Sequence, residues 1–183
     1  TGPVFSAGAD LEAARAGLAR SPLWERLSGA IAALPCVSIA ALNGTAAGGC
    51  MGMVLACDLV VAGRSARFDS RFLTIGIHPG GGHTWRLRNI TNLQTAKAMV
   101  LFEQILDGEQ AVRHGLAWDC VEDDELVDAA VDYAAKAAGH PVELVAVTKQ
   151  TLHDTAGVTE SVPSVQLEIP PQAWSMKQPA FVE

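Results

Sequence analysis

Residues 42–58 (LNGTAAGGCMGMVLACD) constrain the fold more than any other part of this sequence. An apolar run at residues 35–41 precedes them, the pair Gly48-Gly49 lies in their middle, and a second apolar run follows at residues 58–62. A strand, a glycine-rich turn, a helix and a second strand in this order form one crossover unit of a parallel sheet. We therefore expect an α/β core built around this turn.

The glycine pair itself has two interpretations. Glycine lets another molecule approach the backbone closely, and the first amides of the following helix remain free hydrogen-bond donors. Such a turn can hold an anion or a developing oxyanion. Alternatively, Gly48 and Gly49 only allow the turn and the helix to pack tightly, and the residues alone leave both interpretations open.

Composition narrows the class of protein. The chain has 183 residues, of which 49% are hydrophobic and 18% charged, so it can bury a sizeable core. Its net charge of −7 argues against non-specific binding to nucleic acid or to an anionic membrane surface. No apolar run reaches the length of a membrane span, no signal peptide is visible and the four cysteines lack metal-ligand spacing. We expect a cytoplasmic protein without a metal site.

The alternation of strands and helices continues to about residue 105, beyond which the pattern indicates only helix and loop. We therefore predict an α/β core at residues 1–105 and a C-terminal helical region at residues 106–183. The core contains a second glycine-rich turn at residues 77–83 (IHPGGGH).

Three motifs, in this order, resemble the enoyl-CoA hydratase/isomerase, or crotonase, superfamily. They are FSAGADL at residues 5–11, NGTAAGGCMGMVLACDLVVA at residues 43–62, and a block at residues 68–87 that resembles the family segment F…E…G…PG.GGT.RL. The resemblance covers essentially the whole chain. It implies the α/β crotonase-like spiral of ββα units (the ClpP/crotonase fold) with a C-terminal helical trimerisation region, and opening strands that are missing before Thr1. It also implies homotrimers, often paired into hexamers.

The resemblance further implies an oxyanion hole made by the backbone amides of Ala9 and Gly49, which would hold a thioester carbonyl. The ligand or substrate would be an acyl-CoA thioester, and no other cofactor is expected. The substrate-binding positions that the family pattern places in these two turns are Ala7, Gly8, Asp10 and Gly48.

The sequence departs from the family where hydratases carry two catalytic glutamates. Those positions hold Gly52 and Phe72, and neither side chain transfers protons. General acid–base catalysis typically contributes a factor of ~10² to 10⁴, so ordinary hydration is expected to be nearly abolished. Phe72 is then expected to form a wall of the acyl pocket.

Asp69 and His78 are the remaining candidates for an acid or a base, since a histidine can act near neutral pH. Asp69 could instead cap a loop or pair with Arg67 or Arg71. His78 and His83, which flank the second glycine-rich turn, could instead be packing or capping histidines.

Three functions are compatible with the sequence. The first is a lyase or isomerase of the crotonase family that stabilises a thioester enolate with an unconventional acid or base. The second is a non-catalytic acyl-CoA carrier or sensor that retains the oxyanion turns. The third is an inert partner subunit whose helical region serves assembly.

Overall fold

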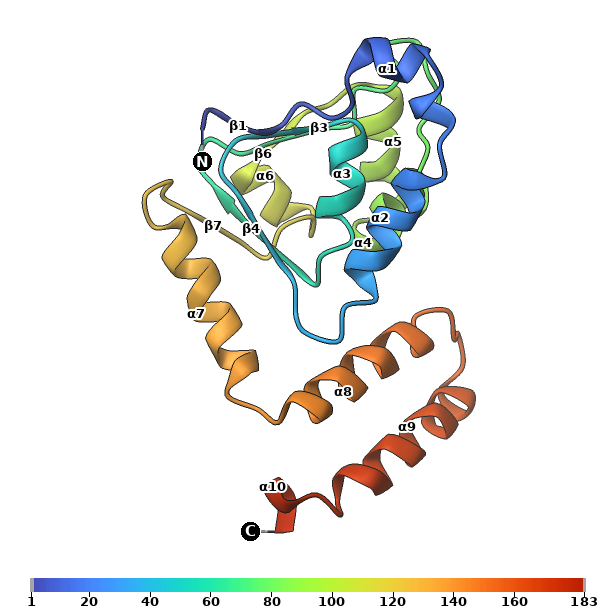
Figure 1. Ribbon diagram of the computed structural model, residues 1–183, viewed down its shortest axis with the longest axis vertical. Coiled ribbons are helices and arrows are strands. Elements are labelled where there is room, and N and C mark those ends of the chain that lie inside the picture. Colours follow the sequence, from blue (N-terminus) through green and yellow to red (C-terminus); the bar gives the residue numbers. More distant parts are fainter. Residues whose placement is uncertain (1, 183) are drawn as a thin grey trace. The chain divides into compact units, whose positions relative to one another are not determined.

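The structure is a computed structural model that describes residues 2–182 (Figure 1). These residues form two compact units: the first extends up to residue 34 and from 38 to 132, and the second contains residues 35–37 and those from 133 onward. The strands are β1 (Val4–Ser6), β2 (Ile39–Leu42), β3 (Thr45–Ala47), β4 (Leu59–Gly63), β5 (Arg67–Asp69), β6 (Leu106–Asp107) and β7 (Asp119–Val121). The helices are α1 (Leu11–Arg15), the 3-10 helix η1 (Leu18–Arg20), α2 (Leu23–Ala32), α3 (Gly49–Val54), α4 (His83–Ile90), α5 (Leu93–Leu101), α6 (Gly108–Arg113), α7 (Leu126–Ala138), α8 (Val142–Thr155), α9 (Ser161–Ser175) and α10 (Pro179–Val182).

The first unit contains two small sheets with strand orders β1-β3-β5-β6 and β2-β4-β7. The expected crossover is present, because β2 and β4 pair in parallel with Ile39 opposite Leu59. Between them the chain forms β3, which pairs in parallel with β1 and β5 in the other sheet. One crossover therefore carries the chain from one sheet to the other before α3 begins.

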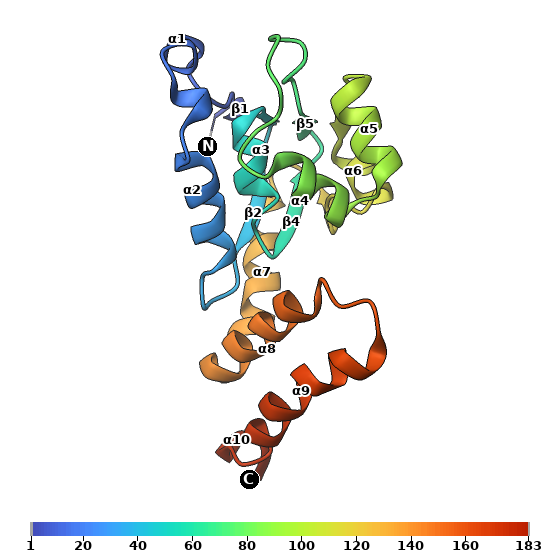
Figure 2. The ribbon, with the colours of Figure 1, turned by 90° about the vertical axis from the view of Figure 1, so that its right-hand side faces the viewer.

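The helix that follows the glycine pair is buried in the core of the first unit. Cys50 and Met51 of α3 are fully buried and belong to one cluster with Phe68, Leu87 and Met99. Burying each large apolar side chain contributes roughly 1.5–3 kcal/mol. Helix α2 lies beside α3 (Figure 2). The start of α3 is therefore held in place by the core on one side and by α2 on another.

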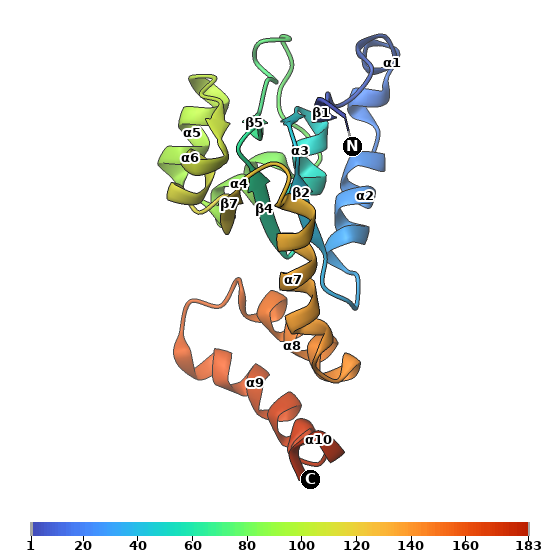
Figure 3. The same ribbon diagram turned by 90° about the vertical axis from the view of Figure 1, so that its left-hand side faces the viewer.

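The prediction that only helix and loop follow residue 105 is wrong. β6 pairs antiparallel with β5. β7 pairs in parallel with β4, beside which it lies in Figure 3. Strands of two and three residues are too short to show the alternating pattern by which a strand is predicted. Because these strands pair with core strands, the first unit continues to Asp132, and its limit differs from the predicted boundary at 105.

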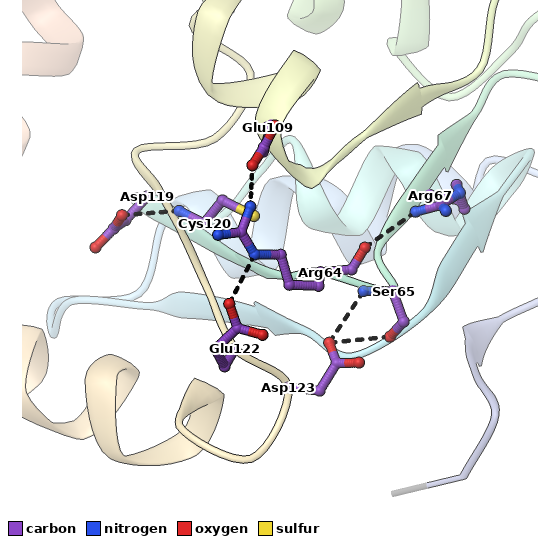
Figure 4. A network of polar contacts seen from close by, with 8 residues as sticks. All are labelled: Arg64, Ser65, Arg67, Glu109, Asp119, Cys120, Glu122 and Asp123. Carbon is purple, nitrogen blue, oxygen red and sulfur yellow. Dashed lines mark hydrogen bonds and ion pairs between the residues drawn. The ribbon is translucent and has the colours of Figure 1, made fainter.

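A surface network ties this later segment to the turn between β4 and β5 (Figure 4). The Arg64 guanidinium pairs with Glu109 and Glu122, with 3.0 Å between its Nε and Oε1 of Glu122. The Asp123 carboxylate accepts hydrogen bonds from the Ser65 amide at 3.0 Å and the Ser65 hydroxyl at 3.1 Å. Exposed ion pairs contribute only about 0–1 kcal/mol each, so the network orients these segments more than it stabilises them.

The second unit consists mainly of helices. Helices α8 and α9 pack against each other, and the Lys149 ammonium on α8 donates to the Cys36 carbonyl at 3.1 Å. Across residues 2–182, no helix combines the length and the apolar character that crossing a bilayer demands.

Candidate functional site

A cavity of about 480 Å³ lies in the first unit. Its wall comes from the turn after β1, the α1–α2 segment, the start of α3 and residues 71–83. The predicted site residues that line it are Ala7, Ala9, Asp10, Gly48, Gly49, Phe72 and His78. A cavity of this size, lined mainly by small and apolar side chains, suits a small-molecule ligand.

The two glycine-containing turns meet at this cavity. Gly8 has a φ of +90°, and a Cβ atom placed on it would lie 2.6 Å from the Ala47 carbonyl oxygen and 3.5 Å from the Gly49 nitrogen. Only glycine fits such a contact without displacing the neighbouring backbone. Within residues 2–182, neither the amide of Ala9 nor that of Gly49 has a hydrogen-bond acceptor. Two unpaired donors from distant parts of the sequence therefore border one cavity.

Other hydrogen bonds hold both turns in shape. The Gly48 amide donates to the Asp69 carbonyl at 3.0 Å, which ties the second turn to β5. The Gly8 amide donates to the Ser6 hydroxyl at 3.2 Å. Asp10 caps α1, because its Oδ1 accepts from the Ala13 amide at 2.8 Å. The donors that remain unpaired are thus part of a fixed backbone.

Trp24 of α2 lies between the start of α3 and the second glycine-rich turn. A Cβ atom on Gly49 would lie 3.0 Å from the Trp24 ring, and one on Gly81 would lie 2.9 Å from the Trp24 Cβ. The indole Nε1 donates to the Leu18 carbonyl at 3.0 Å, so the ring is fixed. No motif in the sequence marks Trp24 as a residue of the site.

Polar side chains from other elements lie beside Gly52 and Phe72. A Cβ atom on Gly52 would lie 3.1 Å from the hydroxyl oxygen of Ser28, a buried residue of α2 that lines the cavity. The Phe72 ring packs edge-on against His83 of α4, with 4.9 Å between ring centroids. The sequence shows no sign of Ser28, and it presents His83 only as one of two histidines that flank the second glycine-rich turn.

His83 is the most deeply buried polar residue of the cavity wall, with 1% of its surface exposed. Its Nε2 lies 2.9 Å from the Ser70 hydroxyl oxygen. Burial lowers the pKa of His83 from 6.5 to about 4, so the ring is neutral at neutral pH. The signal for this residue in the sequence is its position, with His78, beside the second glycine-rich turn.

The two predicted acid–base candidates lie in different surroundings. His78 lines the cavity, and its Nδ1 lies 2.7 Å from the Pro79 carbonyl oxygen. Asp69 is buried, its carboxylate accepts from the Arg71 Nε at 2.7 Å, and it is not among the residues that line the cavity. Pairing with Arg71 is one of the alternative roles that the sequence allowed for Asp69.

Solved structures with the same architecture define the class of protein. The enoyl-CoA hydratase of Mycobacterium smegmatis aligns with a TM-score of 0.92 at 25% identity, over 100% of this chain and 73% of that one. The enoyl-CoA hydratase of Bacillus anthracis aligns with a TM-score of 0.90 at 27% identity, over 100% of this chain and 73% of that one. The chain therefore has the crotonase fold.

The particular family follows from the sequence comparisons. The profile of the enoyl-CoA hydratase/isomerase family matches residues 1–170. The probable enoyl-CoA hydratase EchA14 of Mycobacterium tuberculosis is 40% identical over an alignment of 190 residues. The alignment covers 98% of this chain and 73% of the relative. The 2,3-dehydroadipyl-CoA hydratase of Escherichia coli is 38% identical, over 84% of this chain and 62% of the relative. The chain belongs to the enoyl-CoA hydratase/isomerase family.

Proposed function

We propose that the cavity binds the thioester group of an acyl-CoA, with its carbonyl oxygen accepting hydrogen bonds from the amides of Ala9 and Gly49. The observation that carries this proposal is the pair of unpartnered amides on two abutting turns at one cavity. Preorganised donors of this kind stabilise a developing oxyanion by roughly 3 kcal/mol each. The family to which the chain belongs supports the choice of ligand.

The reaction that this arrangement favours is that of an enoyl-CoA hydratase or isomerase in which the amides stabilise a thioester enolate. Its acid or base is unconventional, because Gly52 and Phe72 stand where hydratases of the family carry glutamates. His78 is the first candidate because it lines the cavity. Asp69 is the second, since its carboxylate is engaged by Arg71.

One observation favours a second function, a non-catalytic acyl-CoA carrier or sensor. The side chains at positions 52 and 72 cannot transfer protons, whereas the turns that would bind the thioester are intact. Such a protein would retain the affinity of the family for acyl-CoA and lose its turnover.

Titration calorimetry of the purified chain with a panel of acyl-CoAs tests the common part of both proposals. We expect binding of at least one member, followed by hydration or isomerisation of the matching enoyl-CoA if the protein is an enzyme. Binding without turnover of crotonyl-CoA and longer enoyl-CoAs would support the carrier. Absence of binding to every acyl-CoA would refute both.

A matched pair of variants tests the Gly49 amide. Proline is tolerated at the first position of a helix, and Gly49 is the first residue of α3. Gly49→Ala and Gly49→Pro both place a Cβ against Trp24, but only proline removes the N–H donor. We expect Gly49→Pro to bind acyl-CoA at least about tenfold more weakly than Gly49→Ala. Equal affinities would mean that this amide does not hold the ligand.

We further propose a homotrimeric or hexameric assembly, which the family resemblance implies. In the second unit, large apolar side chains are exposed on several helices, among them Val142 at 71%, Leu152 at 68% and Val162 at 72%. Light scattering coupled to size-exclusion chromatography would measure the mass, and a monomer at all concentrations would refute this proposal.

A further inference from the structure

The imidazole of His83 has one ring nitrogen that nothing in the protein satisfies. Its Nε2 pairs with the Ser70 hydroxyl, but Nδ1 is buried and has no hydrogen-bond partner among residues 2–182. Buried polar atoms of native proteins are nearly always paired, because an unpaired one loses its hydration without compensation. His83 also lines the cavity. A molecule in the cavity is therefore the nearest source of a partner for Nδ1.

The surroundings of the ring limit the chemistry of that partner. Phe72 packs edge-on against the imidazole, and Ile75 and Ile77 line the same cavity. Because the ring is uncharged at neutral pH, it offers a hydrogen bond but no net charge to a ligand. Arg71, which also lines the cavity, is already paired with Asp69. These surroundings favour a polar but uncharged group over a carboxylate.

We propose that Nδ1 of His83 binds a hydroxyl or oxo group on the acyl chain, so that the preferred ligand is an oxygen-substituted acyl-CoA. This inference rests on the proposed binding of acyl-CoA in the cavity. A hydroxyl group satisfies Nδ1 in either tautomer, whereas an oxo group requires that Nδ1 carry the proton and that the Ser70 hydroxyl donate to Nε2. Contact requires a small shift of the cavity wall, since Nδ1 is buried.

An unsubstituted acyl chain would leave Nδ1 unpaired in the complex. The affinity difference between an oxygenated ligand and its plain counterpart therefore reports on this contact. Pairing an otherwise unsatisfied buried group strengthens binding by about tenfold or more. The same difference should vanish when the ring nitrogen is removed.

The experiment compares three ligands of equal chain length by titration calorimetry at pH 7.5: butyryl-CoA, acetoacetyl-CoA and 4-hydroxybutyryl-CoA. We expect at least one oxygenated ligand to bind the unmodified chain about tenfold more tightly than butyryl-CoA. In His83→Phe, which keeps a ring and removes both nitrogens, this preference should be lost. His114→Phe is the matched control, because His114 lies outside the cavity wall.

A second measurement does not depend on the folding of a variant. In protein with ¹⁵N-labelled histidine, the oxygenated ligand should shift the Nδ1 resonance of His83, and butyryl-CoA should not. Equal affinity for all three ligands, a preference that survives in His83→Phe, or an unchanged Nδ1 resonance would each overturn the inference while leaving acyl-CoA binding intact. Failure of every ligand to bind would instead refute the proposed function.

Discussion

A Cβ atom on Gly8 would lie 3.5 Å from the amide nitrogen of Gly49, so the turn after β1 and the turn before α3 are in direct contact. Parallel pairing of β1 with β3 brings these turns together, with Val4 opposite Thr45. Within residues 2–182, neither turn supplies a hydrogen-bond acceptor to the amide of Ala9 or of Gly49. The contact between the two turns is made mainly by backbone atoms. Substitution of its glycines is therefore the direct way to test it.

Gly8→Ala should disrupt the site. The new Cβ would meet the Ala47 oxygen at 2.6 Å at a residue with positive φ, so both backbone strain and a steric clash oppose it. We expect a loss of roughly 2–4 kcal/mol in the free energy of unfolding and at least tenfold weaker acyl-CoA binding. Urea denaturation and calorimetry measure the two effects.

Gly17→Ala is the matched control for this variant. Gly17 also has a positive φ, of +125°, but a Cβ atom there would meet nothing within 4 Å. Gly17→Ala should therefore lower the free energy of unfolding only by the cost of backbone strain, about 1–2 kcal/mol, and leave the affinity for acyl-CoA unchanged. Similar affinities for the Gly8 and Gly17 variants would argue that the contact between the turns does not shape the site.

The buried imidazole of His83 should make the protein less stable in mild acid. The unfolded chain takes up a proton at this residue below pH 6.5, whereas the folded chain does so only below about pH 4. Between these values the unfolded state binds more protons, so stability falls as the pH is lowered through this window. Above pH 6.5 both states are neutral, and the residue contributes no pH dependence.

The expected size of this effect is roughly 2–3 kcal/mol between pH 7 and pH 4.5 from this residue alone. Urea denaturation at the two pH values should show that difference when the unmodified chain is compared with His83→Phe, in which other titrating groups are unchanged. If the stability of His83→Phe falls as steeply as that of the unmodified chain when the pH is lowered, His83 is not the source of this pH dependence.

Trp24 should support the site as well as the fold. Its ring lies against Gly49, so truncation to alanine, which keeps the Cβ beside Gly81, would leave space beside the turn at Gly48-Gly49. Because the residue is only partly buried, we expect Trp24→Ala to cost about 2–3 kcal/mol, somewhat less than for a fully buried tryptophan. Acyl-CoA affinity should fall together with stability.

Trp118→Ala provides the comparison, because Trp118 is 66% exposed and lies outside the cavity wall. Its truncation should change the free energy of unfolding by about 1 kcal/mol or less. Thermal denaturation measures the stability of each variant, and calorimetry measures its affinity for acyl-CoA. Together they separate the general effect of losing an aromatic ring from a specific effect on the site. Unchanged ligand affinity in Trp24→Ala would remove Trp24 from the site.

The parts of the structure that could be predicted depend on local chemistry. The pair Gly48-Gly49 indicated either a close approach to the backbone or tight packing of the turn, and apolar runs on either side of residues 42–58 indicated a parallel crossover. Both features appear in the structure, since β2 and β4 pair in parallel and the turns abut. The alternation of apolar and polar residues could not reveal β6 and β7, because strands of two or three residues are too short for a pattern.

The side chains of the cavity wall were harder to predict, because tertiary packing decides which of them reach it. Ser28 and Trp24 face the cavity only because α2 packs beside α3, and no spacing in the sequence encodes that contact. The sequence marks His83 as one of two histidines beside the second glycine-rich turn, but not its packing against Phe72 or its contact with Ser70. Separating Asp69 from His78 as candidates likewise required the position of Arg71.

The contact between Ser28 and Gly52 should appear as an energetic coupling. A Cβ on Gly52 would lie 3.1 Å from the Ser28 hydroxyl oxygen, which is closer than most such contacts. Gly52→Ala should therefore be less favourable in the unmodified chain than in Ser28→Ala, where the oxygen is absent. A double-mutant cycle by urea denaturation should give a coupling of about 0.5–1 kcal/mol. If the two effects simply add, the Ser28 hydroxyl does not fill the space in which a side chain at position 52 would begin.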